Sequence, residues 1–254
     1  MLEVLGLTKR YQRRAVVDVV NFRVAPGEVL GYLGPNGSGK STTVKMITGL
    51  LEPSEGVVLY HGRNIRDDLK AFQRILGYVP EEPFVYPYLT GREYLQLTGR
   101  LRSMPESLLS EKIDSLLNLF SLYEHRFSPI SSYSKGMKQK ILITAALLHD
   151  PQVVIFDEPL SGLDVTTAMV FKSLVHALSR RGKVILYSSH VLEVVEKVCT
   201  RVLILRQGRV VAHDSVAHLR TLLQSPSLED VFSQLVVQED TEKIAEEMAA
   251  VIGG

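Results

Sequence analysis

The sequence predicts an α/β fold, with a mostly parallel sheet, an antiparallel β region near the N-terminus and an inserted helical subdomain. From residue 153, short apolar runs alternate with helical periodicity (VVIF, AMVFKSLVHAL, VILYS, VLIL), which is typical of parallel strands with covering helices. Residues 2–30 instead contain two β-like runs, LEVLGL and AVVDVVNFRV, punctuated by Pro26 and Gly27. Residues 86–150 contain segments at helical spacing.

The remaining elements follow in chain order. After the N-terminal β region the sequence predicts a strand in EVLGYLG, a helix in STTVKMITGL, and strands at 56–60 and 75–79. Within the insertion it predicts helices at 92–101, 107–120 and 136–148, and near the end an amphipathic helix from Leu228 to Val236. We therefore expect one domain over 1–236, with a helical subdomain at about 86–150, and an acidic tail over 237–254.

Composition limits the classes of protein to which the chain can belong. The chain has 254 residues, of which 45% are hydrophobic, enough for a substantial core. A net charge of +1 gives no reason to expect a polyanionic partner. The single cysteine, Cys199, excludes an internal disulfide and favours a reducing compartment. No apolar run approaches the roughly 18 residues of a membrane span, so we expect any membrane crossing to be made by another chain.

A glycine-rich loop follows the EVLGYLG strand and precedes a helix. Its pattern, G-x-x-x-x-G-K-[ST], is typical of P-loop nucleotide-binding cores, because glycines let successive N–H groups point at phosphate oxygens and the helix N-terminus adds positive charge. Within it, Lys40 is expected to reach the β- and γ-phosphates and Ser41 to ligate Mg²⁺. The predicted phosphate-binding residues are Gly34, Pro35, Asn36, Gly37, Ser38, Gly39, Lys40, Ser41 and Thr42.

Two carboxylates, Asp157 and Glu158, come directly after the apolar strand VVIF. The carboxyl end of a strand in an α/β sheet is where ligands bind. Asp157 is therefore expected to support Mg²⁺, and Glu158 to polarise a water molecule for attack on the γ-phosphate. The alternative is a solvated acidic turn.

His190 follows another apolar strand, VILYSSH. If that strand ends beside the same phosphate site, a neutral imidazole can hydrogen-bond the γ-phosphate or the attacking water. The alternative is an ordinary surface or capping histidine.

The order of motifs, phosphate loop, YSKGMKQK, VVIFDEP, LSGLD and SSH, resembles the ABC ATPase family over most of the chain. The resemblance implies that Ser134 and Gly136, in a variant of the family's LSGGQ signature, contact the γ-phosphate held by a partner subunit. It also implies that Asp164 lies at a dimer interface and that Tyr11 stacks on adenine. For Tyr11 the alternative is an ordinary edge-strand tyrosine.

Two departures from the family pattern are present. Glu81 stands where the family has its Q-loop glutamine, and the signature has Lys135 and Met137 in place of glycine and glutamine. GYVPEE, SKGMKQ and the closing LEDVF are similar to the nucleotide-binding subunits of ABC-2-type exporters. Glu81 is expected either to ligate Mg²⁺ when the metal is bound or to point to solvent.

The resemblance implies an ATP-hydrolysing subunit with ATP and Mg²⁺ as cofactors, paired with a second, identical or related ATPase subunit. It would power a separate integral membrane permease from the cytoplasmic face of the cell membrane, and the resemblance favours export as the direction of transport. We expect no nucleic acid partner. The alternative is a soluble ABC ATPase acting on ribosomes or DNA. The segment 83–91, PFVYPYLTG, is expected to dock the permease or, alternatively, to close the helical subdomain over the core.

Overall fold

A computed structural model describes residues 1–12, 14–82, 84–236, 248 and 251–252. Its larger sheet has six strands in the order β10-β9-β3-β8-β7-β6. The five strands from β9 to β6 are parallel, and β10 pairs antiparallel with β9. The predicted mostly parallel sheet is therefore confirmed. Its strands are β3 (Val29–Leu33), β6 (Leu76–Val79), β7 (Val153–Asp157), β8 (Val184–Ser188), β9 (Arg201–Arg206) and β10 (Arg209–Ser215).

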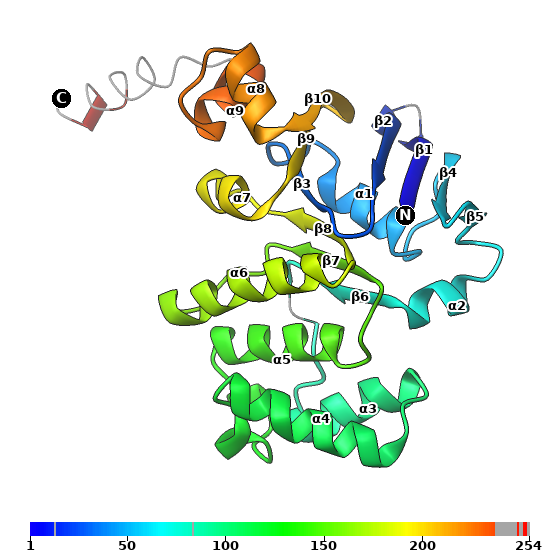
Figure 1. The fold of residues 1–254 in the computed structure, drawn as a ribbon, viewed down its shortest axis with the longest axis vertical. Helices are drawn as coiled ribbons and strands as arrows, with labels where there is room; N and C mark the ends of the chain where they lie inside the picture. The colour runs from blue at the N-terminus through cyan, green and yellow to red at the C-terminus, as the bar shows by residue number, and fades with distance from the viewer. Residues whose placement is uncertain (13, 83, 237–247, 249–250, 253–254) are drawn as a thin grey trace.

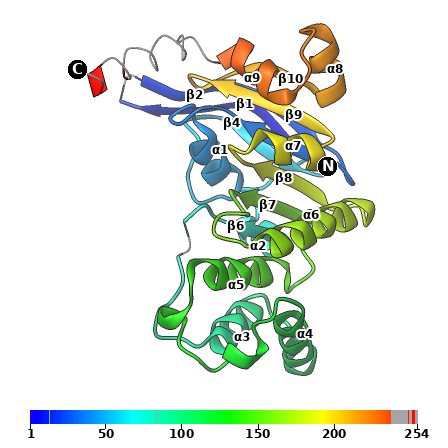
Figure 2. The same ribbon diagram turned by 90° about the vertical axis from the view of Figure 1, so that its left-hand side faces the viewer.

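The second sheet is antiparallel and lies at the N-terminal end of the chain, as the sequence predicts. Its order is β2-β1-β4-β5. The strands are β1 (Leu2–Tyr11), β2 (Arg14–Val24), β4 (Glu55–Tyr60) and β5 (Arg63–Asn64). The helix α1 (Lys40–Ile47) buries Val44 and Ile47 in one core cluster with residues of both sheets, and Figure 2 shows it between them.

Helices cover the opposite face of the parallel sheet (Figure 1). Side chains that alternate along a strand point to opposite faces. On β7, Val154 and Phe156 join the core beneath the helices, whereas Val153 and Ile155 join the core shared with α1 and the antiparallel sheet. Because both faces are covered, every residue of β3, β7 and β8 is buried, which explains the unbroken apolar runs in the sequence.

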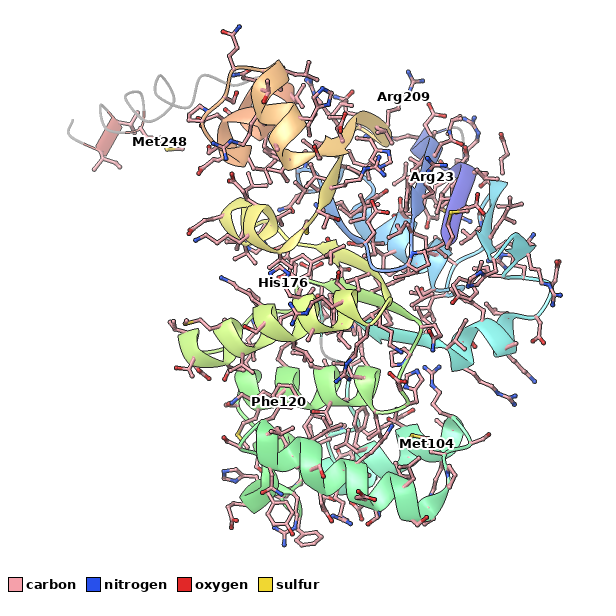
Figure 3. All side chains as sticks on the ribbon, in the orientation of Figure 1. Arg23, Met104, Phe120, His176, Arg209 and Met248 are labelled. Carbon is pink, nitrogen blue, oxygen red and sulfur yellow. The ribbon has the colours of Figure 1, made fainter. Side chains whose placement is uncertain are left out.

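Three helices, with two short 3₁₀ turns, fall within the range predicted as a helical insertion. They are α3 (Gly91–Leu101), α4 (Glu106–Leu119) and α5 (Lys135–Leu147), and the turns span Tyr123–His125 and Ile130–Ser132. A capping box between Thr90 and Glu93 begins α3. The buried apolar residues of α4 and α5 belong to the same core cluster as Phe156, and Figure 3 labels Phe120, which is buried at the end of α4. The insertion and the parallel sheet therefore share one continuous core.

After β7 the chain forms α6 (Val165–Arg180), α7 (Leu192–Val198), α8 (Val216–Leu222) and the predicted amphipathic helix α9 (Leu228–Val236). A further short helix, α2 (Leu69–Arg74), precedes β6. Most of the predicted acidic tail, 237–254, lies outside the described residues. Among the residues that the structure describes, no helix is long and apolar enough to cross a membrane.

Candidate functional site

A cavity of about 210 Å³ lies at the carboxyl ends of β3, β7 and β8, where the sequence predicts the phosphate site. It is partly open and its lining is mainly polar. The lining residues are Val16, Asn36, Gly37, Gly39, Lys40, Ser41, Thr42, Glu81, Asp157, Glu158 and His190. Residues from four separate sequence motifs therefore meet at one place.

Close approach of the backbone explains two of the loop glycines. Gly34 and Gly39 both have positive φ angles, of 156° and 103°. A Cβ on Gly39 would lie 2.7 Å from the carbonyl oxygen of Val16, and one on Gly34 would lie 2.5 Å from that of Leu205. Only glycine fits at these two positions without a backbone shift.

The loop leads directly into the N-terminus of α1. Gly39 is the N-cap, and no side chain in the described part of the chain caps the first turn of the helix. The N–H groups of that turn therefore remain available for an anion, and the helix dipole favours negative charge there. This arrangement suits a phosphate group at the mouth of the cavity.

The ammonium group of Lys40 contacts the loop itself. Its Nζ donates hydrogen bonds to the carbonyl oxygens of Gly34 at 2.6 Å and Pro35 at 3.1 Å. Burial lowers the pKa of Lys40, and the nearby carboxylates of Glu158, Asp157 and Glu81 act in the opposite direction. Among the lining residues, the ammonium group of Lys40 thus faces three carboxylates.

Asp157 and Glu158 differ in exposure and in backbone conformation. Asp157 ends β7 and is buried, and this burial raises its pKa to about 6; the charges of Glu81 and Glu158 add to the rise. Glu158 has a left-handed backbone conformation, with φ of 48°, and its N–H donates to the carbonyl oxygen of Ser188 at 3.0 Å. Strained backbone of this kind persists only where the surrounding structure fixes it.

Both carboxylate oxygens of Glu158 have partners from the loop after β8. Ser189 Oγ lies 3.1 Å from Oε2, and His190 Nδ1 lies 2.9 Å from Oε1. The imidazole of His190 is 78% exposed. His190 and Glu158, predicted separately from the sequence, are therefore in direct contact.

The other residues predicted to contact the nucleotide differ in whether they line the cavity. Glu81 is exposed yet lines the cavity. Ser38 is buried with a hydroxyl that has no hydrogen-bond partner among the described residues, and its side chain does not line the cavity. Tyr11 lies outside the cavity, half exposed at the end of β1, and Lys9 Nζ is 5.5 Å from its ring centroid.

Ser134, Gly136 and Asp164 lie together, but outside the cavity. We call them, with Gly162, the signature cluster. Ser134 is the N-cap of α5 and Asp164 is the N-cap of α6. A Cβ on Gly136 would lie 2.5 Å from the carbonyl oxygen of Gly162. The signature and the LSGLD segment are therefore packed backbone against backbone.

Sequence reasoning missed three residues in or beside the site. Val16 lines the cavity from β2, Ser189 contacts Glu158, and Gln139 Nε2 donates to the carbonyl oxygen of Pro159 at 3.0 Å. Gln139 is fully buried near the start of α5, a position at which an amide side chain needs a partner. A glutamine within an otherwise apolar helix is a pattern from which this contact could have been suspected.

Comparison with known proteins agrees with this geometry. The family described as ABC transporter matches residues 17–161. The ABC transporter ATP-binding protein NatA of Bacillus subtilis (strain 168) is 34% identical, with 94% of this chain and 99% of that protein covered.

Two solved structures have the same fold. One, the ATP binding subunit of an ABC transporter, is 34% identical with a TM-score of 0.88, and covers 92% of this chain and 99% of its own. The other, a dimeric ATP-binding cassette in a post-hydrolysis state bound to ADP and Pi, is 24% identical with a TM-score of 0.78, and covers 85% and 98%. The chain belongs to the ABC transporter family, as an ATP-binding and ATP-hydrolysing subunit.

Proposed function

We propose that the chain hydrolyses Mg²⁺-ATP in the cavity at the carboxyl ends of the parallel strands and uses it to drive a separate membrane permease. The convergence of the Lys40 ammonium, the Asp157 and Glu158 carboxylates and the uncapped α1 N-terminus carries this proposal. These are the groups that phosphoryl transfer requires: donors for the phosphates, ligands for a metal ion and a base for water.

Each residue has a distinct role in this proposal. Lys40 and the loop N–H groups bind the phosphates, and Glu158 accepts the proton of the attacking water while His190 assists. Ser41 and Asp157 would hold Mg²⁺, with Glu81 as a third oxygen ligand. The donor set fits, because these three residues line one cavity and Mg²⁺ is usually bound through one or two carboxylates, here Asp157 and Glu81, together with phosphate oxygens. Bound Mg²⁺ supplies positive charge that offsets the developing negative charge on the phosphates.

We place the second half of the nucleotide site on another ATPase subunit. Ser134 and Gly136 of that subunit would contact the γ-phosphate, and Asp164 would lie at the interface. The location of the signature cluster outside the chain's own cavity supports this arrangement. ATP would then link two subunits, and hydrolysis would release them.

The test uses Glu158→Gln, which keeps the size of the side chain but removes the proton acceptor. We expect phosphate release to fall by about a thousandfold, while ATP binding persists and gel filtration with ATP and Mg²⁺ shows a dimer. A strictly monomeric variant at saturating ATP would contradict the paired site. Unchanged phosphate release would contradict the role of Glu158.

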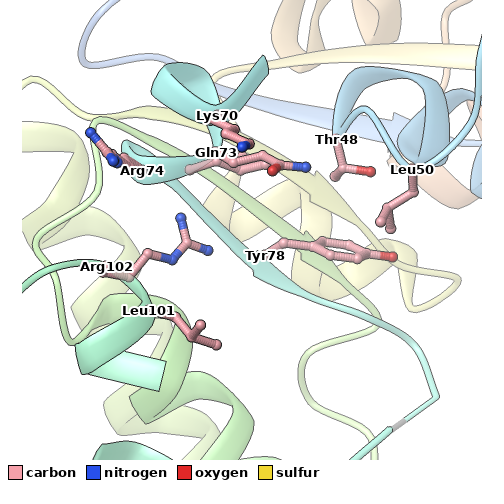
Figure 4. Close-up of a pocket in the computed structure, with 9 residues that line it drawn as sticks. Thr48, Leu50, Lys70, Gln73, Arg74, Tyr78, Leu101 and Arg102 are labelled. Atoms are coloured by element: carbon pink, nitrogen blue, oxygen red, sulfur yellow. The ribbon is translucent and has the colours of Figure 1, made fainter. Parts of the chain in front are cut away.

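We propose that the segment 83–91 docks the permease. The described side chains of Phe84, Tyr86 and Tyr88 are exposed, Tyr88 to 91%, and exposed aromatic residues are typical interface anchors. The segment joins β6 to α3, and those elements help line a cleft of about 430 Å³ that also contacts α2 (Figure 4). In that cleft Arg102 Nη1 is buried without a hydrogen-bond partner among the described residues, which suits an acidic side chain of the permease.

Replacement of Tyr86 and Tyr88 by alanine separates docking from folding. We expect basal phosphate release to be unchanged, and less multi-span membrane protein to co-purify with the chain. Leu222→Ala, which removes an exposed apolar side chain on the distant helix α8, is the matched control. If the double variant unfolds instead, the aromatic residues serve to close the helical region over the core.

We further propose export as the direction of transport, from the inner face of the cell membrane, because GYVPEE, SKGMKQ and LEDVF are similar to ABC-2-type exporter subunits. The rival, a soluble ABC ATPase acting on ribosomes or DNA, gains no support from a net charge of +1. Co-purification with ribosomes or DNA in place of a membrane protein would favour that rival.

A further inference from the structure

The loop after β8 contacts Glu158 through two side chains with very different exposure. Ser189 is 4% exposed, whereas the imidazole of His190 is 78% exposed. Water competes with the His190 contact far more than with the Ser189 contact. Ser189 is therefore the more persistent partner of the Glu158 carboxylate.

The direction of the Ser189 hydrogen bond follows from its second partner. The backbone N–H of Val191 donates to Ser189 Oγ at 3.1 Å. An N–H group only donates, so the serine hydroxyl accepts there and its own proton is available for Glu158 Oε2, 3.1 Å away. A hydroxyl held in this way by the backbone is aimed before any substrate binds.

Strand register places the two residues opposite each other. Asp157 pairs with Ser188 at the ends of β7 and β8, and the Glu158 N–H donates to the Ser188 carbonyl oxygen. Glu158 and Ser189 are the residues that directly follow the two strands. The same strand pair thus fixes both the strained backbone of Glu158 and the partner of its side chain.

We propose that Ser189 is a positioning residue for hydrolysis: its hydroxyl holds Oε2 of Glu158, so that Oε1, which contacts the exposed His190, is the oxygen that accepts the proton of the attacking water. This inference rests on the role proposed above for Glu158. Ser189 itself touches neither water nor phosphate in this mechanism. It acts by restricting the rotamers of the base, which keeps the carboxylate in an orientation productive for proton transfer.

A purely structural role for Ser189 would give a different experimental result. The Val191–Ser189 hydrogen bond lies just before α7 begins, so loss of the hydroxyl could merely weaken that turn. In that case Tm would fall, and ATP binding and turnover would decline together. A positioning role predicts a lower kcat with unchanged KM for ATP.

The experiment compares Ser189→Ala with Ser189→Thr, which retains a hydroxyl, and with Ser179→Ala, which removes a half-buried hydroxyl bonded to Gly27 far from the cavity. We expect kcat to fall about tenfold in Ser189→Ala, with KM and Tm unchanged. Ser189→Thr should recover most of the rate, and Ser179→Ala should match the parent.

A second comparison separates this inference from the role of Glu158. In the Glu158→Gln background, Ser189→Ala should cause no further loss in single-turnover hydrolysis, because the base that it orients is gone. An equal tenfold loss in that background, or a Ser189→Ala rate equal to the parent's, would overturn the positioning role. If Glu158→Gln itself hydrolyses ATP normally, the failure lies in the proposed role of Glu158.

Discussion

The phosphate cavity and the signature cluster use polar residues in opposite ways. In the cavity, no described side chain caps the first turn of α1, and the hydrogen bonds of Lys40 to the described residues are with loop carbonyl oxygens. In the signature cluster Ser134 accepts the Met137 N–H at 3.2 Å and Asp164 accepts the Thr167 N–H at 2.8 Å. The cavity thus combines an uncapped helix N-terminus with a lysine bonded to neutral carbonyl oxygens, whereas the cluster satisfies its own helix ends.

This difference indicates which region needs a ligand. Positive groups whose hydrogen-bond partners are neutral gain most from a bound anion, so the cavity is expected to bind nucleotide by itself. The signature cluster satisfies its own helix ends, so we expect it to add contacts only to an anion that is already held elsewhere. Variants in the two regions should therefore affect binding and hydrolysis separately.

Lys40→Ala should have the largest effect on binding. It removes the cavity's charge-assisted donor, so we expect ATP affinity to fall by about a thousandfold. Equilibrium binding of a fluorescent ATP analogue measures this. Lys45→Ala, which removes an exposed lysine from the same helix, should bind as the parent does. Unchanged affinity in Lys40→Ala would break the distinction between the two regions.

Gly136→Ala should act on hydrolysis and spare binding. The added Cβ would lie 2.5 Å from the Gly162 carbonyl oxygen, so the signature and the LSGLD segment must separate. We expect phosphate release to fall about thirtyfold, since small misplacements are costly in catalysis. ATP affinity, measured in the same preparation, is the internal control. A parallel loss of affinity would show that the signature cluster supports the chain's own cavity.

The sequence predicts those parts of the fold and of the cavity that follow a periodic pattern or a known motif. β3, β7 and β8 are buried on both faces, so their apolar runs are unbroken and easily recognised. The loop glycines and Lys40 have a fixed spacing because close backbone approach at Gly34 and Gly39 permits no side chain. Both patterns are local in the sequence, so they can be recognised without the tertiary structure.

Contacts between distant segments could not be predicted in the same way. The partnership of Ser189 with Glu158 depends on the pairing of β7 with β8, and serine after a strand has no distinctive pattern. Short helices such as α2 and α7 are too brief to establish a helical period. Neither Tyr11 nor the signature residues line the chain's own cavity, so their proposed contacts require a nucleotide or a second subunit.

Glu81→Gln tests the role of charge in the cavity, and its expected effect on nucleotide binding is smaller. Glu81 lines the cavity, and its charge acts on both Lys40 and Asp157. Removing that charge should tighten metal-free nucleotide binding by about threefold and weaken the Mg²⁺ dependence of activity. Glu82→Gln, at the exposed neighbour that is absent from the lining, is the control. If Glu81→Gln matches the parent in both quantities, Glu81 is not linked to the metal.

The smallest expected effect concerns the contact between α5 and β6, away from both regions: α5 begins at the signature, and His149 follows its opposite end. His149 Nε2 lies 3.1 Å from the Leu76 carbonyl oxygen of β6, and since a carbonyl only accepts, Nε2 carries the proton. Burial, together with the charge of Arg102, lowers the pKa of His149 to about 4.

In the unfolded chain this pKa is about 6.5, so the unfolded state binds a proton more readily than the folded state. The stability contributed by neutral His149 is therefore complete above about pH 6.5 and is lost as pH falls towards 4. We expect Tm to drop by about 2–4 °C between pH 7 and pH 5 from this group. His149→Gln keeps a donor for the Leu76 carbonyl but does not titrate, so it should lose that part of the drop. An identical pH dependence in parent and variant would mean that the junction between α5 and β6 is insensitive to this histidine.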